Sequence, residues 1–146
     1  MIRITPFRAD DIEQLEASQL ASAQLAMTDP RPLARHYAAL GHAFAARDAG
    51  GRIVFCGGAA RNHDGYATLW ALYAQNIKPA TAARLLRATR QFLDGLHEFA
   101  RVDAMVEASH PVAIKWAQRC GLTFEARLAR AAIDGGDLLI FRKDWA

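Results

Sequence analysis

Apolar and polar residues alternate in several short segments, which is the pattern of half-buried β-strands. The segments are residues 2–5, 42–47, 52–61, 66–74, 102–108, 124–133 and 138–142. Asp64-Gly65 precedes the clearest alternation, in 66–74, and predicts a hairpin turn because both residues tolerate positive φ. The sequence therefore predicts three successive antiparallel strands between residues 42 and 74.

Apolar residues recur at helical intervals in four other segments. These are residues 10–27, 30–40, 79–96 and 111–120. Pro79 and Pro111 stand at the first helical position, where proline is favoured, and Asp10 with Glu13 has the spacing of a capping box. Gly121 is placed to end the last helix, as Gly41 is for the second.

The pair Gly57-Gly58 lies inside a predicted strand, where glycine normally weakens pairing. Two interpretations are open, a β-bulge or a close approach of another backbone segment.

The predicted order of elements is β-α-α-β-β-β-α-β-α-β-β, which indicates an α/β (α+β) fold with a mixed sheet. A helix connects the strand that ends near Ala74 to the strand that starts near Val102, and such a crossover implies that the two strands are parallel. Ligands of such sheets favour the place where strand pairing changes, because backbone groups there lack partners.

Composition limits the possible classes of protein. The chain has 146 residues, 52% of them hydrophobic and 23% charged, which predicts one globular domain spanning residues 1–146. It has no apolar run long enough to cross a membrane and no signal-peptide core. Cys56 and Cys120 form neither a disulfide framework nor a metal-binding spacing, so we expect a cytoplasmic protein without a metal. A net charge of +3 is weak evidence for nucleic-acid binding, and we expect no such partner.

The C-terminal third carries a family resemblance. In the run 110–122, Ala113, Ile114 and Gly121 match a common pattern of the GNAT-type N-acetyltransferase superfamily, and Trp116 and Leu122 match it in residue type. The segments 134–135 and 138–141 match its closing hairpin. The chain resembles this superfamily over nearly its whole length, which implies a GNAT-like, mostly antiparallel sheet of about six to seven strands with four helices.

The resemblance also implies an acetyl-CoA-binding loop at residues 78–83. Lys78 and Thr81 replace the usual leading residue and first glycine of this loop, whereas Ala83 is an allowed variant. Pyrophosphate binding requires backbone N–H groups that converge at a helix start. Small side chains allow the close approach that this needs, but alanine and threonine lose the positive φ that glycine allows.

The donor-binding residues implied by the resemblance come from the strand end, this loop, the following helix and the helix after it. They are Leu72, Ala74, Lys78, Ala80, Thr81, Ala82, Ala83, Arg84 and Trp116. Arg84, together with Arg87, is suited to pairing with CoA phosphates, although a solvated helix face is an equally good interpretation.

The usual catalytic residues of the superfamily are absent. Ala117 occupies the position of the tyrosine that serves as general acid, and residues 66–74 contain no acidic side chain. Three residues are candidates in their place. His110 is a candidate acid or base or else a helix cap, Glu107 a candidate substrate ligand or else a solvated acid, and Tyr73 a candidate donor to the thioester or else a core residue.

Two functions are compatible with these features. The first is acetyl-CoA-dependent transfer of an acetyl group to an amine of a small molecule or protein. The second is a catalytically inactive binding or assembly module, similar to small phage-borne proteins that look like superfamily members with degraded loops. The first interpretation requires the strands near Ala74 and Val102 to part and leave room for an extended thioester. The identity of the acceptor amine is open, and a homodimer is compatible with the sequence.

Overall fold

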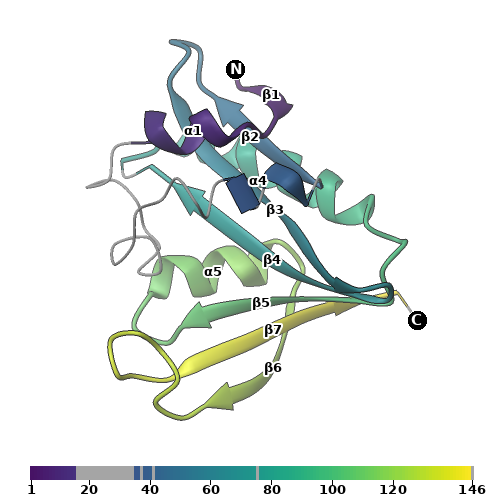
Figure 1. The fold of residues 1–146 in the computed structure, drawn as a ribbon. Helices are drawn as coiled ribbons and strands as arrows, with labels where there is room; N and C mark the ends of the chain where they lie inside the picture. Colours follow the sequence, from purple (N-terminus) through teal and green to yellow (C-terminus); the bar gives the residue numbers. More distant parts are fainter. Residues whose placement is uncertain (16–34, 37, 41, 75, 146) are drawn as a thin grey trace. The chain divides into compact units, whose positions relative to one another are not determined.

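The computed structural model describes residues 1–15, 35–36, 38–40, 42–74 and 76–145. Apart from the predicted second helix, the described elements follow the predicted order (Figure 1). The elements are β1 (Arg3–Pro6), α1 (Ala9–Gln14), β2 (Ala43–Arg47), β3 (Ile53–His63), β4 (Tyr66–Tyr73), α4 (Pro79–Asp94), β5 (Arg101–Glu107), α5 (Pro111–Arg119), β6 (Thr123–Leu128) and β7 (Leu138–Asp144).

Residues 16–27 of the predicted first helix, residues 30–34 and 37 of the predicted second helix, and the predicted Gly41 cap lie outside the described residues. Residues 35, 36, 38 and 39 of the predicted second helix are helical. The first helix begins at Ala9 rather than at the predicted Asp10 cap, and Asp11 rather than Glu13 takes the capping role. Oδ2 of Asp11 accepts a hydrogen bond from the Arg8 N–H at 2.8 Å. Oδ1 of this buried carboxylate lies 3.3 Å from the Arg47 guanidinium on β2, so Asp11 ties the helix start to the sheet.

The strands form a seven-stranded sheet in the order β1-β2-β3-β4-β5-β7-β6. The pairs β1–β2, β2–β3, β5–β7 and β6–β7 are antiparallel, and β4–β5 is parallel, as the helical crossover predicts. The mixed, mostly antiparallel sheet is thus confirmed. Among the described residues, no helix has the length and apolar character needed to cross a membrane.

The hairpin between β3 and β4 is confirmed, but its predicted backbone conformation is wrong. Neither Asp64 nor Gly65 has positive φ. The Gly65 N–H instead donates to Nδ1 of His63 at 3.2 Å, so a side chain supports the turn.

Gly57 and Gly58 mark a close approach and not a bulge. A Cβ on Gly58 would lie 2.5 Å from the His42 carbonyl oxygen. The register shift between β2 and β3 falls between Ala46 and Arg47, which pair with Phe55 and Ile53. The glycines therefore let β2 and its preceding residue pack tightly against β3.

The strand predicted over 124–133 ends earlier, at Leu128. Arg130 has a φ of 59° and its N–H donates to Oδ1 of Asp137 at 3.1 Å. Oδ2 of the same carboxylate accepts from the Arg127 guanidinium at 2.7 Å. These bonds to a side chain replace strand pairing and turn the chain out of the sheet.

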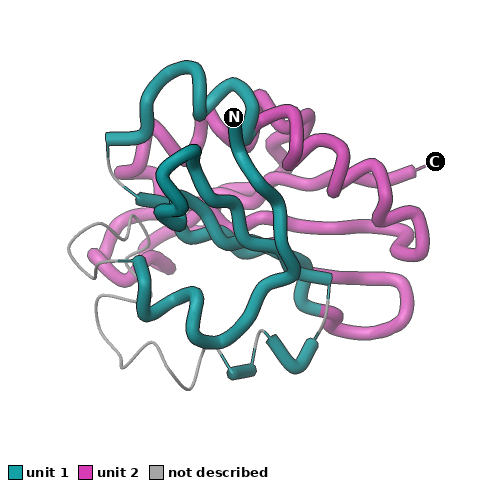
Figure 2. Tube along the Cα trace, turned by 90° about the horizontal axis from the view of Figure 1, so that it is seen from above, with its two compact units in different colours: residues 1–60, 70–85 teal, residues 61–69, 86–146 magenta. Residues whose placement is uncertain are grey.

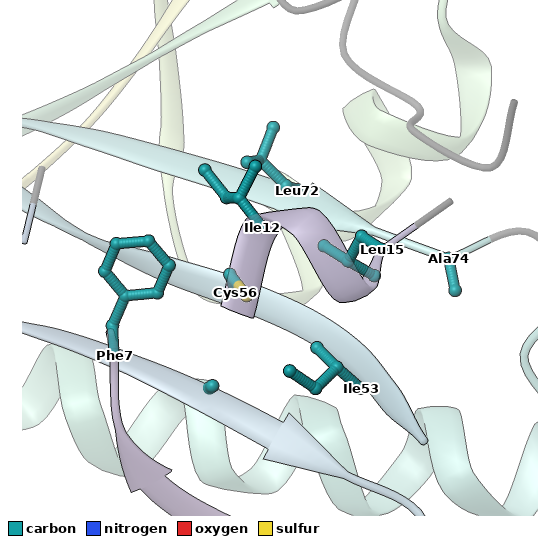
Figure 3. Packing of buried hydrophobic residues seen from close by; sticks show 8 residues of the cluster. Phe7, Ile12, Leu15, Ile53, Cys56, Leu72 and Ala74 are labelled. Carbon is teal, nitrogen blue, oxygen red and sulfur yellow. The ribbon is translucent and has the colours of Figure 1, made fainter. Parts of the chain in front are cut away.

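The chain divides into two compact units (Figure 2). Unit 1 comprises residues 1–60 and 70–85, and unit 2 comprises residues 61–69 and 86–146. Helix α4 and strand β4 each have residues in both. Unit 1 contains a buried apolar cluster (Figure 3), which consists of Phe7, Ile12, Leu15, Ala45, Ile53, Cys56, Leu72 and Ala74.

Unit 2 has its own buried apolar residues. They are contributed by α4, the segment after it, β5 and β7, and include Leu93, Leu96, Phe99, Val102, Val106, Leu139 and Phe141. Helix α5 contacts β5 and β6. Its C-terminal end is held by Arg90 of α4, whose Nε donates to the Arg119 carbonyl oxygen at 2.7 Å.

Candidate functional site

The end of β4 is fixed to the core of unit 1. Leu72 and Ala74 belong to its apolar cluster, with exposures of 3% and 2%. The Ala74 N–H donates to the Val54 carbonyl oxygen of β3 at 2.9 Å. Ile77, just before α4, packs against the same cluster. The segment that joins β4 to α4 is therefore anchored on both sides of residues 75 and 76.

Asn76 supplies a backbone conformation that the sequence prediction missed. Its φ is 60°, in the left-handed region that asparagine adopts more readily than most residues. An asparagine just after a strand was the available signal. The turn before α4 therefore has its positive φ at Asn76, and the positions of the usual loop glycines do not need one.

The predicted acetyl-CoA loop at residues 78–83 is for the most part the first turn and a half of α4. The helix begins at Pro79, and the Ala82 N–H donates to the Lys78 carbonyl oxygen at 2.9 Å. The first N–H groups of a helix lack partners within it. Pro79, the first residue of α4, has no backbone N–H group. Ala80 and Thr81 thus contribute the donors, next to small side chains.

Basic side chains accompany this helix start. Lys78, Arg84 and Arg87 are exposed, and none of them forms an ion pair with another described residue. Arg90, one turn further, is instead used to hold the end of α5. The positive charge near the start of α4 is therefore carried by Lys78, Arg84 and Arg87.

Tyr73, the last residue of β4, has an unusual hydroxyl group. The residue is half-buried, and its hydroxyl oxygen is buried without a hydrogen-bond partner, the single such side-chain atom within the described residues. Burial raises the pKa of Tyr73 above its ordinary value, so the phenol stays protonated at neutral pH.

Two other candidates lie in unit 2. Glu107 is the half-buried last residue of β5, opposite Leu138 of β7. Its carbonyl oxygen accepts a hydrogen bond from the His110 N–H at 3.0 Å. These two residues are thus placed together by one short connection between β5 and α5.

His110 occupies the N-cap position of α5, but its side chain makes no capping hydrogen bond. The capping interpretation is therefore wrong for the imidazole. The neighbouring Ser109 hydroxyl donates to Oδ2 of Asp134 at 2.7 Å. This bond, with one from the Gly136 N–H and the nearby His110, lowers the pKa of Asp134. The β6–β7 connection is thereby tied to the start of α5.

Helix α5 carries Trp116, which is half-buried, and Ala117, which is buried. The helix ends as predicted, with Gly121 following at a φ of 89°. Burial raises the pKa of the Cys56 thiol to about 12 and that of Cys120 to about 11, which excludes both as nucleophiles at neutral pH. Among the described residues, no group of three or more potential ligands could hold a metal ion.

The pairing of β4 with β5 covers only part of either strand. It runs from Tyr66 opposite Arg101 to Leu69 opposite Ala104, whereas β4 continues to Tyr73 and β5 to Glu107. Residues 70–73, the last four of β4, therefore lie outside this pairing.

The fold is shared with many solved acetyltransferase structures. The ribosomal-protein-S18-alanine N-acetyltransferase from Escherichia coli matches with a TM-score of 0.74 and 16% identity, over 99% of this chain and 94% of that one. A GNAT-family acetyltransferase from Bacillus anthracis matches with a TM-score of 0.72 and 12% identity, over 98% and 94%. The chain has the GNAT fold.

A further solved structure that matches is named for spermidine acetylation. A chimera of the Vibrio cholerae spermidine N-acetyltransferase SpeG and hSSAT matches with a TM-score of 0.72 and 15% identity, over 98% of this chain and 95% of that one. No protein-family model and no curated protein matches the sequence of this chain. In these comparisons, the GNAT fold is therefore shown by tertiary structure alone.

Proposed function

We propose that this GNAT-fold protein is an acetyl-CoA-dependent N-acetyltransferase that transfers an acetyl group to an amine of a small molecule or a protein. The observation that carries the proposal is the start of α4. There, two backbone N–H donors lie beside small side chains and beside basic residues that form no ion pair within the described ranges, directly after the strand whose pairing with β5 stops at Leu69.

The phosphates of CoA are suited to this helix start. Unsatisfied N–H groups and the positive end of the helix dipole favour anions. Ala80 and Thr81 would donate their N–H groups to the pyrophosphate, and the Thr81 hydroxyl adds a donor. Lys78 and Arg84 would neutralise charge, with Arg87 next along the exposed side of the helix.

The thioester end of the donor would lie along β4. In the transfer, the amine nitrogen forms a bond to the carbonyl carbon and the carbon–sulfur bond breaks. The proton lost by nitrogen has to reach the departing sulfur. Holding amine and thioester in contact contributes much of the rate by itself, and Glu107 and His110 are the proposed groups for accepting and passing on the proton. Trp116 is proposed to pack against the pantetheine arm.

We also propose that residues 1–146 act as one functional domain and that the protein is located in the cytoplasm. The two free, buried cysteines are in keeping with a reducing compartment.

A second function, a catalytically inactive GNAT-fold binding or assembly module, is favoured by a specific observation. Ala117 occupies the position where the superfamily has a tyrosine that serves as general acid, and β4 carries no acidic residue. The two functions differ in whether the protein binds acetyl-CoA.

Calorimetric titration of the full chain with acetyl-CoA and with CoA tests the proposal. We expect micromolar to millimolar dissociation constants for both. Thr81→Glu should abolish binding, because it places a carboxylate against the pyrophosphate. Thr123→Glu makes the same chemical change at an exposed position of β6, outside the proposed site, and should leave binding unchanged.

No measurable heat with either ligand, at high protein concentration, would favour the inactive module. Unchanged affinity of the Thr81→Glu variant would show that the phosphates bind somewhere other than the start of α4.

A further inference from the structure

The backbone of Tyr73 is held firmly, because both of its neighbours are buried in the apolar cluster of unit 1. Ala74 is in addition hydrogen-bonded to Val54 on β3. Side chains of a strand alternate between its two faces. Since Leu72 and Ala74 point into the cluster, the Tyr73 side chain lies on the opposite face of β4.

A buried tyrosine hydroxyl normally has a hydrogen-bond partner. The Tyr73 hydroxyl has no partner among the described residues, and replacing it by hydrogen would remove a polar atom that they leave unsatisfied. Tyr66, at the other end of β4, shows the ordinary arrangement, because its hydroxyl donates to Oδ2 of the buried Asp103 at 2.5 Å. The contrast indicates that, within the part of the chain that the structure describes, the Tyr73 hydroxyl is available to a bound ligand.

We propose that the Tyr73 hydroxyl donates a hydrogen bond to the thioester carbonyl oxygen of the bound acetyl donor. The inference rests on the proposed function, since it requires acetyl-CoA to bind with its acyl end beside the end of β4. It gives the donor site a polar group that recognises the acetyl group itself, in addition to those suited to the phosphates.

The chemistry is consistent with a donor that keeps its proton. As the amine nitrogen attacks the carbonyl carbon, negative charge develops on the carbonyl oxygen, and a pre-placed donor stabilises it. When the carbon–sulfur bond breaks, the amine proton is transferred to sulfur, and the tyrosine O–H stays intact. The raised pKa of Tyr73 is compatible with this role, because the phenol remains a donor over the whole neutral range.

The test is Tyr73→Phe, which removes only the hydroxyl group, with Tyr66→Phe as the matched control. Calorimetry with acetyl-CoA and CoA and a thermal melt without ligand are measured for the wild-type protein and both variants. We expect Tyr73→Phe to weaken acetyl-CoA binding about tenfold, the order of one lost hydrogen bond, with the affinity for CoA unchanged. Its melting temperature should be equal to or higher than that of the wild-type protein.

Tyr66→Phe should behave in the opposite way, with a lower melting temperature and wild-type affinities for both ligands. Equal affinity of wild type and Tyr73→Phe for acetyl-CoA would overturn the inference and leave the proposed function standing. So would a melting temperature of Tyr73→Phe that falls as it does for Tyr66→Phe, because the hydroxyl would then have a structural partner. A wild-type protein that binds neither ligand would refute the proposed function, and this inference with it.

Discussion

Gly58 offers a direct test of the packing between β2 and β3 in unit 1. It pairs with Ala43, and a Cβ built on it would lie 2.5 Å from the His42 carbonyl oxygen and 2.8 Å from the Cα and Cβ of Ala43. Real Cβ atoms essentially never come within 3.0 Å of such atoms. Because the obstructing atoms belong mainly to backbone, rotation of a side chain cannot relieve the contact. Gly58→Ala must therefore displace β2 from β3.

Overpacking of this kind typically costs about 1–3 kcal/mol. For a chain of this length, each kcal/mol lowers the melting temperature by about 2–4 °C. The expected decrease for Gly58→Ala is therefore roughly 2 to 12 °C. The β-propensity gained by replacing glycine in a strand opposes this loss, and its contribution is at most about 1 kcal/mol.

Thermal melts followed by circular dichroism would measure the effect, with Gly65→Ala as the control. A Cβ on Gly65 has its nearest contacts at 3.9 Å, in the ordinary van der Waals range. Gly65 also lacks a positive φ, so alanine there should be neutral or slightly stabilising. A Gly58→Ala variant as stable as the wild type would refute the close approach of β2 to β3.

Two further predictions follow from pKa shifts. Burial raises the pKa of Cys56 to about 12 and of Cys120 to about 11, so in the native protein both thiols should react with a disulfide reagent at pH 8 far more slowly than after unfolding; rapid reaction of either thiol without denaturant would contradict this. The pKa of Asp134 is lowered, first by the Ser109 hydroxyl, so its contribution to stability is present above the ordinary aspartate pKa and is lost as pH falls through the lower folded-state value. Asp134→Asn should therefore flatten the decrease in urea midpoint below about pH 4, and an unchanged acid dependence would argue against the Ser109 contact.

Local features of the sequence determined most of the secondary structure. Pro79 and Pro111 begin α4 and α5, and Gly121 follows the end of α5 with positive φ, because the conformational limits of these residues act within a few positions. Alternation in 66–74 and in 102–108 placed β4 and β5, and the helix between them determined that they run parallel.

Local features also gave some wrong details. The Asp10 cap, the positive φ of the Asp64-Gly65 turn and the long strand over 124–133 were each typical of their sequence. Each was overridden by a longer-range contact or a side-chain bond, such as the bond from Arg130 to Asp137. Bonds of this kind join residues several positions apart, and the secondary-structure propensities of single residues do not predict them.

The candidate site was only partly visible in the sequence. The resemblance to the GNAT superfamily proposed the region of residues 78–83, and the sequence itself predicted the helix that starts there, because a helix start after a strand is a local feature. Tertiary structure decided that this region is already helical, that Asn76 supplies the left-handed turn, and that the His110 side chain is not a cap. It also decided that the Tyr73 hydroxyl is buried and has no hydrogen-bond partner in the described part of the chain. Such properties depend on which atoms from distant parts of the chain surround a group, and a sequence pattern contains only its neighbours along the chain.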